Sequence, residues 1–247
     1  LGRSGNVGIG FSIPSNSAQR VIQQLIEFGE TKRGWLGVRI QDVTKEIAEV
    51  EKLDKPRGAL VASVAENSPS EKAGIQAGDI ILEFNGEKIN IMKELPAIVA
   101  RTEVGKKVEV VIWRDKKEIV KNVILGRLET SEDFKISKNP ETKDQNNDEI
   151  IQSLRIAVRT LTKEDIKKRK LPNQTTGLVI TKIANNSPLA NSIELNSIIV
   201  EAQKKKILSA DDLRNITNEV LNSNQKTVLL AIYNNQNQRR YIGVKLD

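Results

Sequence analysis

Histidine and cysteine are both missing from this 247-residue sequence, and each absence excludes a kind of chemistry. Without an imidazole the chain cannot form a Ser-His-Asp or Cys-His catalytic group, or a histidine-bound zinc site. Without a thiol it forms no disulfide and no thiolate nucleophile. A lysine-activated serine remains open in principle, but no serine of the sequence stands out beside a lysine. No catalytic residue, metal site or cofactor is therefore predicted.

Aromatic residues and long apolar runs are also scarce. The net charge of +7 is a feature of many nucleic-acid-binding proteins, because Lys and Arg neutralise phosphates. The basic residues are interleaved with acidic ones, however, and four Phe, two Trp and two Tyr give few stacking partners. No apolar run approaches the roughly 18 to 20 residues that a membrane helix needs. We predict neither nucleic-acid binding nor a membrane span.

What the sequence does contain is an internal repeat. Residues 58–69 and 177–188 align without a gap, and each forms an apolar strand pattern that ends in Asn-Ser-Pro. Beyond the prolines, one deletion opposite Gly74 restores the alignment, and the apolar positions match along most of the remaining copy. A repeat of this length predicts two copies of one domain.

The other segments arrange themselves around the two copies. Residues 1–14 alternate apolar and small residues, which we interpret as the last strand of a domain that precedes this sequence. Residues 15–30 predict a connecting helix with one apolar face. The first copy occupies 31–128, the almost entirely polar stretch 129–149 predicts a flexible linker, and the second copy occupies 150–247.

Three motifs of the first copy carry a family resemblance. A glycine-flanked loop, Trp35-Leu36-Gly37-Val38, leads directly into a strand, and a segment with two glycines spans 73–81. A helix is predicted over 92–100, with apolar residues on one face. Together these motifs resemble a PDZ domain in the permuted bacterial order. The segment 5–15 resembles the last strand of the protease domain in the HtrA (Deg, or Do) family of periplasmic serine proteases.

This resemblance implies a fold, a role and a location. The expected fold is mainly β with short helices (α+β), as two PDZ-like, partly open β-barrel or sandwich domains in tandem. The expected role is capture of exposed apolar C-termini, or extended segments, of unfolded proteins for a protease domain that this sequence lacks. The parent protein would be a periplasmic, trypsin-like serine endopeptidase that forms homo-oligomers. The present chain alone would be a monomer without enzymatic activity.

The residues of the first copy suggest how a peptide would bind. Glycines at 34 and 37 allow positive φ angles that turn successive backbone N–H groups toward a terminal carboxylate. The peptide would then add as a strand beside Val38 to Gln41 and place its last side chain in an apolar pocket. The predicted peptide-binding residues are Arg33, Gly34, Trp35, Leu36, Gly37, Val38, Ile40, Leu95, Ile98 and Val99.

A structural interpretation of the same residues stays open. Aliphatic side chains are mostly buried in any small β-rich domain, so each predicted pocket residue taken alone also fits the core. Trp35 either covers the core or contacts a ligand or the protease domain. Arg33 also fits a solvated surface charge, and Gly74, Gly78 and Asp79 fit turn geometry better than ligand binding.

The second copy departs from the motif. Arg155 stands opposite Gly37, and Asn196-Ser197 stand opposite Gly78-Asp79. A Cβ at Arg155 opposes the positive φ that a carboxylate-binding loop needs, whereas Asn196 tolerates the left-handed region. We therefore expect the second copy to keep the fold and to lose carboxylate capture.

Three functions remain in competition at this stage. The first is a peptide-binding tandem PDZ region that serves protein quality control. The second is the function of the whole parent protein, an ATP-independent serine endopeptidase and chaperone. The third is an oligomerisation or regulatory adaptor that binds no peptide.

Overall fold

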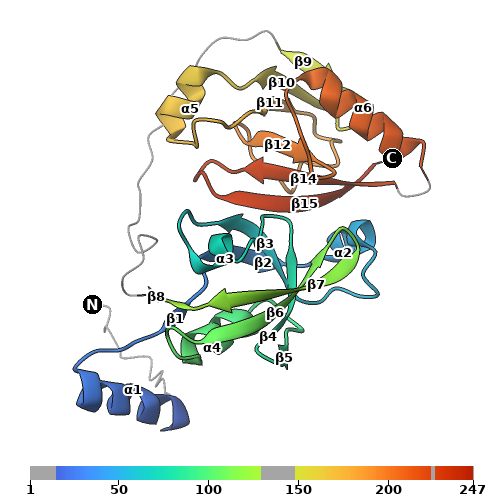
Figure 1. Ribbon diagram of the computed structural model, residues 1–247. Helices are drawn as coiled ribbons and strands as arrows, with labels where there is room; N and C mark the ends of the chain where they lie inside the picture. The colour runs from blue at the N-terminus through green and yellow to red at the C-terminus, as the bar shows by residue number, and fades with distance from the viewer. Residues whose placement is uncertain (1–14, 129–147, 224–225, 247) are drawn as a thin grey trace, which may run out of the picture.

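The computed structural model describes residues 15–128, 148–223 and 226–246, which form two sheet units that lie one above the other (Figure 1). The predicted strand at 1–14 and nearly all of the predicted linker lie outside these residues, although Glu149 already belongs to a strand. In the described part of the chain, no helix is long and apolar enough to cross a membrane.

The first repeat folds around a six-stranded antiparallel sheet with the order β2-β3-β4-β6-β7, with β5 paired to β4. Its elements are β1 (Gly34–Trp35), β2 (Val38–Asp42), α2 (Lys45–Glu51), β3 (Ala59–Val64), α3 (Pro69–Lys72), β4 (Ile80–Phe84), β5 (Glu87–Lys88), α4 (Glu94–Arg101), β6 (Lys107–Arg114), β7 (Lys117–Ile124) and β8 (Gly126–Arg127). The short strand β1 pairs with β8. The predicted Asn85-Gly86 hairpin is confirmed, because both residues have positive φ and join β4 to β5.

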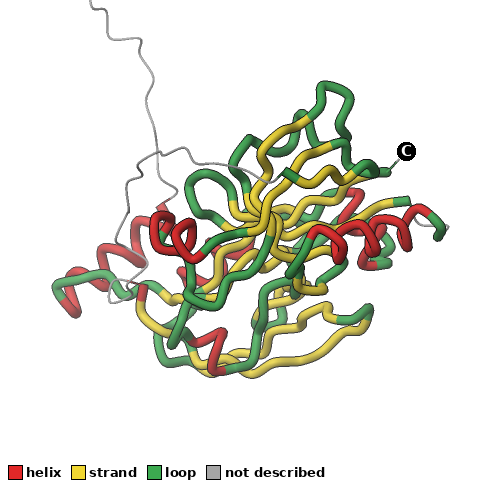
Figure 2. The backbone as a smooth tube through the Cα atoms, turned by 90° about the horizontal axis from the view of Figure 1, so that it is seen from above, coloured by secondary structure: helices red, strands yellow, loops and turns green. Residues whose placement is uncertain are grey.

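The second repeat folds around a seven-stranded antiparallel sheet with the order β15-β14-β12-β11-β10-β9, with β13 paired to β12. Its elements are β9 (Glu149–Ile151), β10 (Ile156–Thr160), α5 (Lys163–Arg169), β11 (Leu178–Ile183), β12 (Ile198–Ala202), β13 (Lys205–Lys206), α6 (Ala210–Leu221), β14 (Thr227–Tyr233) and β15 (Arg239–Lys245). Strands gather at the centre of the molecule and helices lie at its periphery (Figure 2). The predicted fold class is confirmed, and both sheets are open rather than closed into barrels.

The repeat seen in the sequence is reproduced in the strand register. Ile80 and Ile81 pair with Leu60 and Ala59, as Ile198 and Ile199 pair with Val179 and Leu178. A bulge also interrupts the first ladder of both repeats at the same place, where Ala62 and Thr181 have no partner across the ladder. The two copies therefore share local irregularities as well as topology.

Helix α1 (Ser15–Phe28) stands apart from both sheets (Figure 1). It lies within the range 15–30 for which a connecting helix was predicted, and Gly29 follows it with a φ of +70°. Val21, Ile22 and Ile26 on its apolar face are exposed by 45%, 54% and 81%. The core of the first repeat is therefore built without this helix.

The two repeats pack against each other through equivalent faces of their sheets. One buried cluster contains Leu60, Ile80 and Leu82 of the first repeat together with their equivalents Val179, Ile198 and Val200 of the second. Helix α2 adds Ile47 and Ala48 and contacts β14 and β15. Gly243 in β15 is required there, because a Cβ would lie 2.5 Å from the Cβ of Glu46. The two repeats thus share a buried apolar interface, in addition to the separate core of each repeat.

A buried ion pair fixes the turn that precedes β4. The Asp79 side chain is 2% exposed and accepts hydrogen bonds from Arg114 Nε at 2.6 Å and from the N–H of Gln76 at 2.7 Å. Arg114 also donates to the carbonyl of Gly74, and its hydrogen bond with Asp79 raises its pKa above the usual value. Asp79 is therefore structural, in agreement with the turn interpretation.

Asp79→Ala is expected to lower the free energy of unfolding by about 3 kcal/mol, because it leaves a mostly buried guanidinium without its carboxylate. Urea unfolding followed by circular dichroism measures this loss. The control is Asp54→Ala, which removes an exposed ion pair with Arg57 at 3.2 Å and is expected to cost less than about 1 kcal/mol. Equal losses for the two variants would contradict this role of Asp79.

Candidate functional site

The structure brings the predicted pocket residues of the first repeat into one apolar cluster. Leu36, Leu95, Ile98 and Val99 are 1% to 7% exposed, and Val38 and Ile40 of β2 are half-buried against them. Four of the six residues therefore belong to the domain core, as the structural interpretation held. Val38 and Ile40 alone in this set keep partial exposure, and both lie on the strand expected to receive a ligand. Ligand contact at these residues stays a prediction.

The loop before β2 contains two backbone donors that are unpaired among the described residues. The carbonyl of Leu36 accepts from Ser70 N–H at 3.0 Å, and the carbonyl of Gly37 accepts from Ala65 N–H at 2.8 Å. Neither the N–H of Leu36 nor that of Gly37 donates to an acceptor among the described residues. Paired backbone donors of this kind form the nests that bind anions.

Gly37 is the residue that makes this loop conformation possible. Its φ is +77°, and a Cβ at this position would lie 2.2 Å from the Cβ of Ser68. Any side chain would therefore be strained and would also collide with the residue that caps α3. Ser68 was not among the predicted site residues, since only the fold brings it against Gly37.

Gly34 plays a different part from the one predicted, because it does not have a positive φ. A Cβ there would lie 2.3 Å from the carbonyl oxygen of Val99 and 2.8 Å from that of Thr102. Gly34 is needed for the close approach of β1 to the end of α4. The positive φ predicted for Gly34 is therefore wrong, and a ligand contact at this residue stays a prediction.

Trp35 is half-buried and lies over two glycines. A Cβ at Gly37 would be 3.1 Å from Trp35 Cζ2, and a Cβ at Gly126 would be 3.0 Å from Cε3. The ring therefore lies against the loop and its junction with β8, and contact of Trp35 with a ligand stays a prediction. Arg33 is exposed, and its carbonyl accepts from Leu128 N–H at 2.9 Å. Gly126 carried no sequence signal, since its need depends on the indole above it.

The edge of β2 is open. Among the described residues β2 pairs with β3 on one side only, so the backbone groups on its other side have no partner strand. Strand β2 lies at the end of the first sheet, and the core residues of α4 contribute to the same cluster. An extended peptide adds to an open edge strand of this kind.

The second repeat fills the corresponding edge with its own chain. Strand β10 corresponds to β2, and it pairs with β11 on one side and with β9 on the other. Ile151, Ile150 and Glu149 face Ile156, Ala157 and Val158 in antiparallel order. Strand β9 therefore occupies the place where a ligand strand would add.

Side chains fix β9 between β10 and α6. Ile151 is fully buried in the core of the second repeat, beside Leu213 and Ile216 of the helix. Arg214 of α6 donates to the carbonyl of Ile150 at 3.3 Å and forms an ion pair with Glu149 at 3.0 Å. Sequence patterns did not reveal this strand, because it has only three residues and directly follows a long polar stretch.

Arg155 adopts the left-handed conformation that its Cβ was expected to oppose. Its φ is +53°, and its carbonyl accepts from Ala184 N–H as that of Gly37 does from Ala65. Its guanidinium donates to the carbonyl of Asn186 at 2.5 Å, which offsets part of the strain. Asn196 is also left-handed, with a φ of +66°, as predicted. The tight turn between β9 and β10, rather than a lost backbone angle, distinguishes the second repeat.

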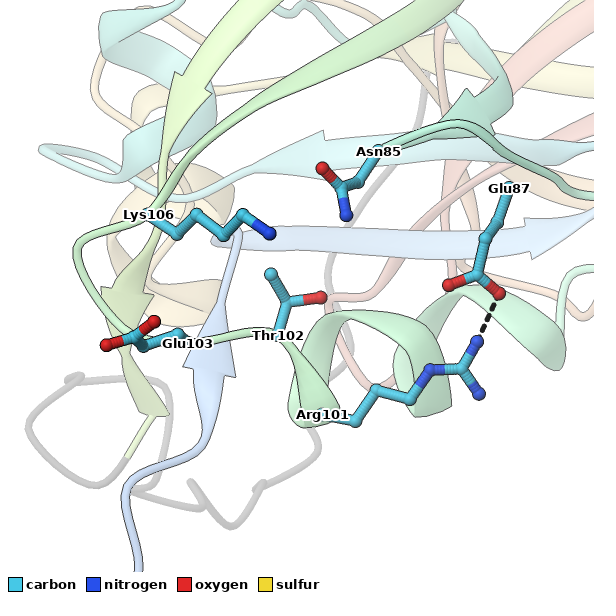
Figure 3. A pocket seen from close by; sticks show the side chains of 6 residues that line it. All are labelled: Asn85, Glu87, Arg101, Thr102, Glu103 and Lys106. Atoms are coloured by element: carbon cyan, nitrogen blue, oxygen red, sulfur yellow. Dashed lines mark hydrogen bonds and ion pairs between the residues drawn. The ribbon is translucent and has the colours of Figure 1, made fainter.

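A polar hollow of about 290 Å³ lies at the end of α4 (Figure 3). It is lined by Asn85, Glu87, Arg101, Thr102, Glu103 and Lys106. Arg101 and Glu87 form an ion pair across it. It contains none of the predicted peptide-binding residues, and its polar lining does not suit an apolar side chain.

Comparison with known proteins identifies the type of domain that the first repeat forms. Residues 34–125 match the family model described as PDZ domain, so the first repeat is a PDZ domain. Over 98% of its length the chain is 33% identical to a probable periplasmic serine endoprotease, DegP-like, of Bartonella henselae, of which it covers 46%. It is 34% identical to the protein of that name in Hahella chejuensis, with 99% of the chain and 50% of that protein covered. The chain is a PDZ-containing member of the HtrA family.

The chain spans about half the length of these curated relatives. Among solved structures, the HtrA-type protease AlgW with decapeptide is 34% identical to this chain, with a TM-score of 0.46. The match covers 51% of this chain and 39% of the AlgW chain. Similarity extends over both repeats and the helix that precedes them, since the relatives align with nearly all of the chain.

Ile151→Ala is expected to lower the free energy of unfolding by about 3 kcal/mol, because it removes a fully buried side chain from the core. Ile150→Ala is the matched control, since Ile150 is the next residue of β9 and is 64% exposed. The control is expected to change stability by less than about 0.5 kcal/mol. Thermal and urea unfolding measure both effects. Similar values for the two variants would show that β9 does not occupy the core as described.

Proposed function

We propose that the first repeat captures exposed apolar C-termini, or extended segments, of unfolded proteins by strand addition at β2. The observation that carries this proposal is the open edge of β2 directly after two unpaired backbone donors, Leu36 and Gly37 N–H. A terminal carboxylate would accept from these donors, while the preceding backbone would pair with β2. The last side chain of the peptide would contact Val38 and Ile40.

The second repeat is proposed to bind no such ligand. Its equivalent edge is occupied by β9, and displacement of β9 would expose the buried Ile151 and break the contacts of Arg214. Both features oppose peptide binding at β10. Peptide capture is therefore assigned to the first repeat alone.

An adaptor role without ligand binding is supported less well. The equivalent outer faces of the two sheets pack against each other within one chain, so neither face remains for contacts between chains. The open edge of β2 has no structural use in that account. Peptide binding explains why this edge is left unpaired.

We further propose that the parent protein is a periplasmic serine endopeptidase and that this region presents substrates to its catalytic domain. The support is that the relatives from Bartonella henselae and Hahella chejuensis are described as probable periplasmic serine endoproteases. The present sequence contains no histidine, so a histidine-dependent triad would lie outside these residues.

A fluorescent peptide that ends in valine is expected to bind the chain, and its C-terminally amidated form is expected to bind about tenfold more weakly or worse. Amidation removes the charge that strengthens hydrogen bonds from the two donors. Fluorescence anisotropy titration measures both affinities. Absence of saturable binding by either peptide would overturn the proposal. Equal affinities would indicate that the peptide binds by strand addition and that its terminal carboxylate is not recognised.

The same titration with two variants locates the site. Val38→Glu adds a negative charge to the strand that directly follows the donors of Leu36 and Gly37, and this charge is expected to repel a terminal carboxylate. Val120→Glu makes the same change on β7, the opposite edge strand, at a side chain that is 56% exposed. Only the change at Val38 is expected to weaken binding. Equal weakening by both variants would place the site elsewhere.

A further inference from the structure

The strand proposed to receive the peptide is held on its other face by the second repeat. Val38 and Ile40 of β2 pack toward the first core, whereas Gln41 points to the opposite face. The Gln41 side chain donates through Nε2 to the carbonyl of Tyr241 at 2.8 Å, and the N–H of Tyr241 donates to Oε1 at 2.7 Å. One amide therefore satisfies both backbone groups of a residue 200 positions away.

Gln41 takes the place of a partner strand at the edge of the second sheet. Among the described residues β15 pairs with β14 alone, so the backbone of Tyr241 that points away from β14 lies at an open edge. Unpaired N–H and C=O groups inside an interface are costly, and a side-chain amide supplies both a donor and an acceptor. This contact ties the two repeats together at a residue of β2 itself.

A second hydrogen bond joins the second repeat to the bulge between β2 and β3. Arg39 pairs with Ser63 and Ile40 with Val61, which leaves Ala62 of β3 without a partner in β2. The carbonyl of Ala62 accepts from Arg239 Nη1 of the second repeat at 2.8 Å. The second repeat therefore holds the β2–β3 pair on both of its strands.

The guanidinium that makes this contact is itself fixed. Arg239 forms an ion pair with Glu201 at 2.8 Å, and its Cζ lies 4.9 Å from the centre of the Tyr241 ring. The hydroxyl of Tyr241 donates to Glu201 at 3.1 Å, and burial raises the pKa of this hydroxyl, so it stays protonated. A rigid cluster of the second repeat thus presents Arg239 to the bulge.

We infer that Gln41 is a positioning residue for peptide binding, through which the second repeat holds β2 in the geometry that accepts a ligand strand. Strand addition gains affinity when the receiving backbone is already ordered, because less conformational freedom is lost on binding. The inference deepens the proposed function and rests on it. It assigns to the second repeat, whose own edge is filled, a part in the affinity of the first.

The coupling acts in both directions. If the interface strengthens peptide binding by some factor, bound peptide strengthens the interface by the same factor. Saturating peptide is therefore expected to slow hydrogen exchange at Tyr241 N–H, although this group lies in the second repeat. A residue that only stabilised the fold would not produce this response.

The test uses the whole chain and the fluorescent valine-ended peptide. Gln41→Met keeps the size of the side chain and removes both hydrogen bonds. It is expected to weaken peptide binding by about fivefold, the lower end of measured couplings between sites. It is also expected to speed hydrogen exchange in β2 and to abolish the protection of Tyr241 N–H by the peptide.

Two controls separate this effect from general loss of stability. Gln76→Met makes the same substitution at an exposed residue of the first repeat. Thr227→Val removes another contact between the repeats, at 3.4 Å from Glu49 of α2, without touching β2. Both are expected to leave the affinity unchanged.

Each outcome has a distinct meaning. Weaker binding in Gln41→Met alone supports the inference. Unchanged binding in Gln41→Met, with normal binding by the unaltered chain, overturns the inference and leaves the proposed function intact. Equal weakening in Thr227→Val also overturns it, because the effect would then come from the interface as a whole. No binding by the unaltered chain overturns the proposed function and the inference together.

Discussion

The edge of a β-sheet exposes backbone N–H and C=O groups that need partners, and the two repeats meet this requirement in different ways. In the first repeat β2 keeps an open edge next to the unpaired N–H groups of Leu36 and Gly37. In the second repeat the chain turns back at Arg155, and β9 covers the equivalent edge. One duplicated fold thus gives one strand that accepts a partner and one that already has it.

The interface between the repeats connects the open strand of the first repeat to the sheet of the second. Equivalent apolar residues of both sheets form one buried cluster, as the two halves of a symmetric dimer would. At its margin, Gln41 and Ala62 connect the ligand strand and its neighbour to Tyr241 and Arg239. The two roles that we propose follow from this arrangement: the first repeat binds the peptide, and the second repeat holds the strand to which the peptide adds.

Sequence patterns predicted the features that depend on local chemistry. Alternating apolar residues and Asn85-Gly86 determine strands and turns over a few residues, and the duplication gave the correspondence of Ile80 with Ile198, which the strand register confirms. Features that depend on distant partners escaped prediction. Gln41 meets Tyr241 across 200 positions, and Gly34 is required by the end of α4 rather than by its own φ. No periodicity in the sequence records such contacts.

The most direct test of the account is a peptide titration of the isotopically labelled whole chain followed by backbone amide NMR. The open edge predicts that a valine-ended peptide shifts the amide signals of residues 36–42 first and most, and leaves those of β10 at Ile156–Thr160 unmoved. Protection of the β2 amides from exchange would accompany these shifts. Signals that move at β10, or that move equally at both strands, would contradict the claim that one repeat is open and the other is filled by its own chain.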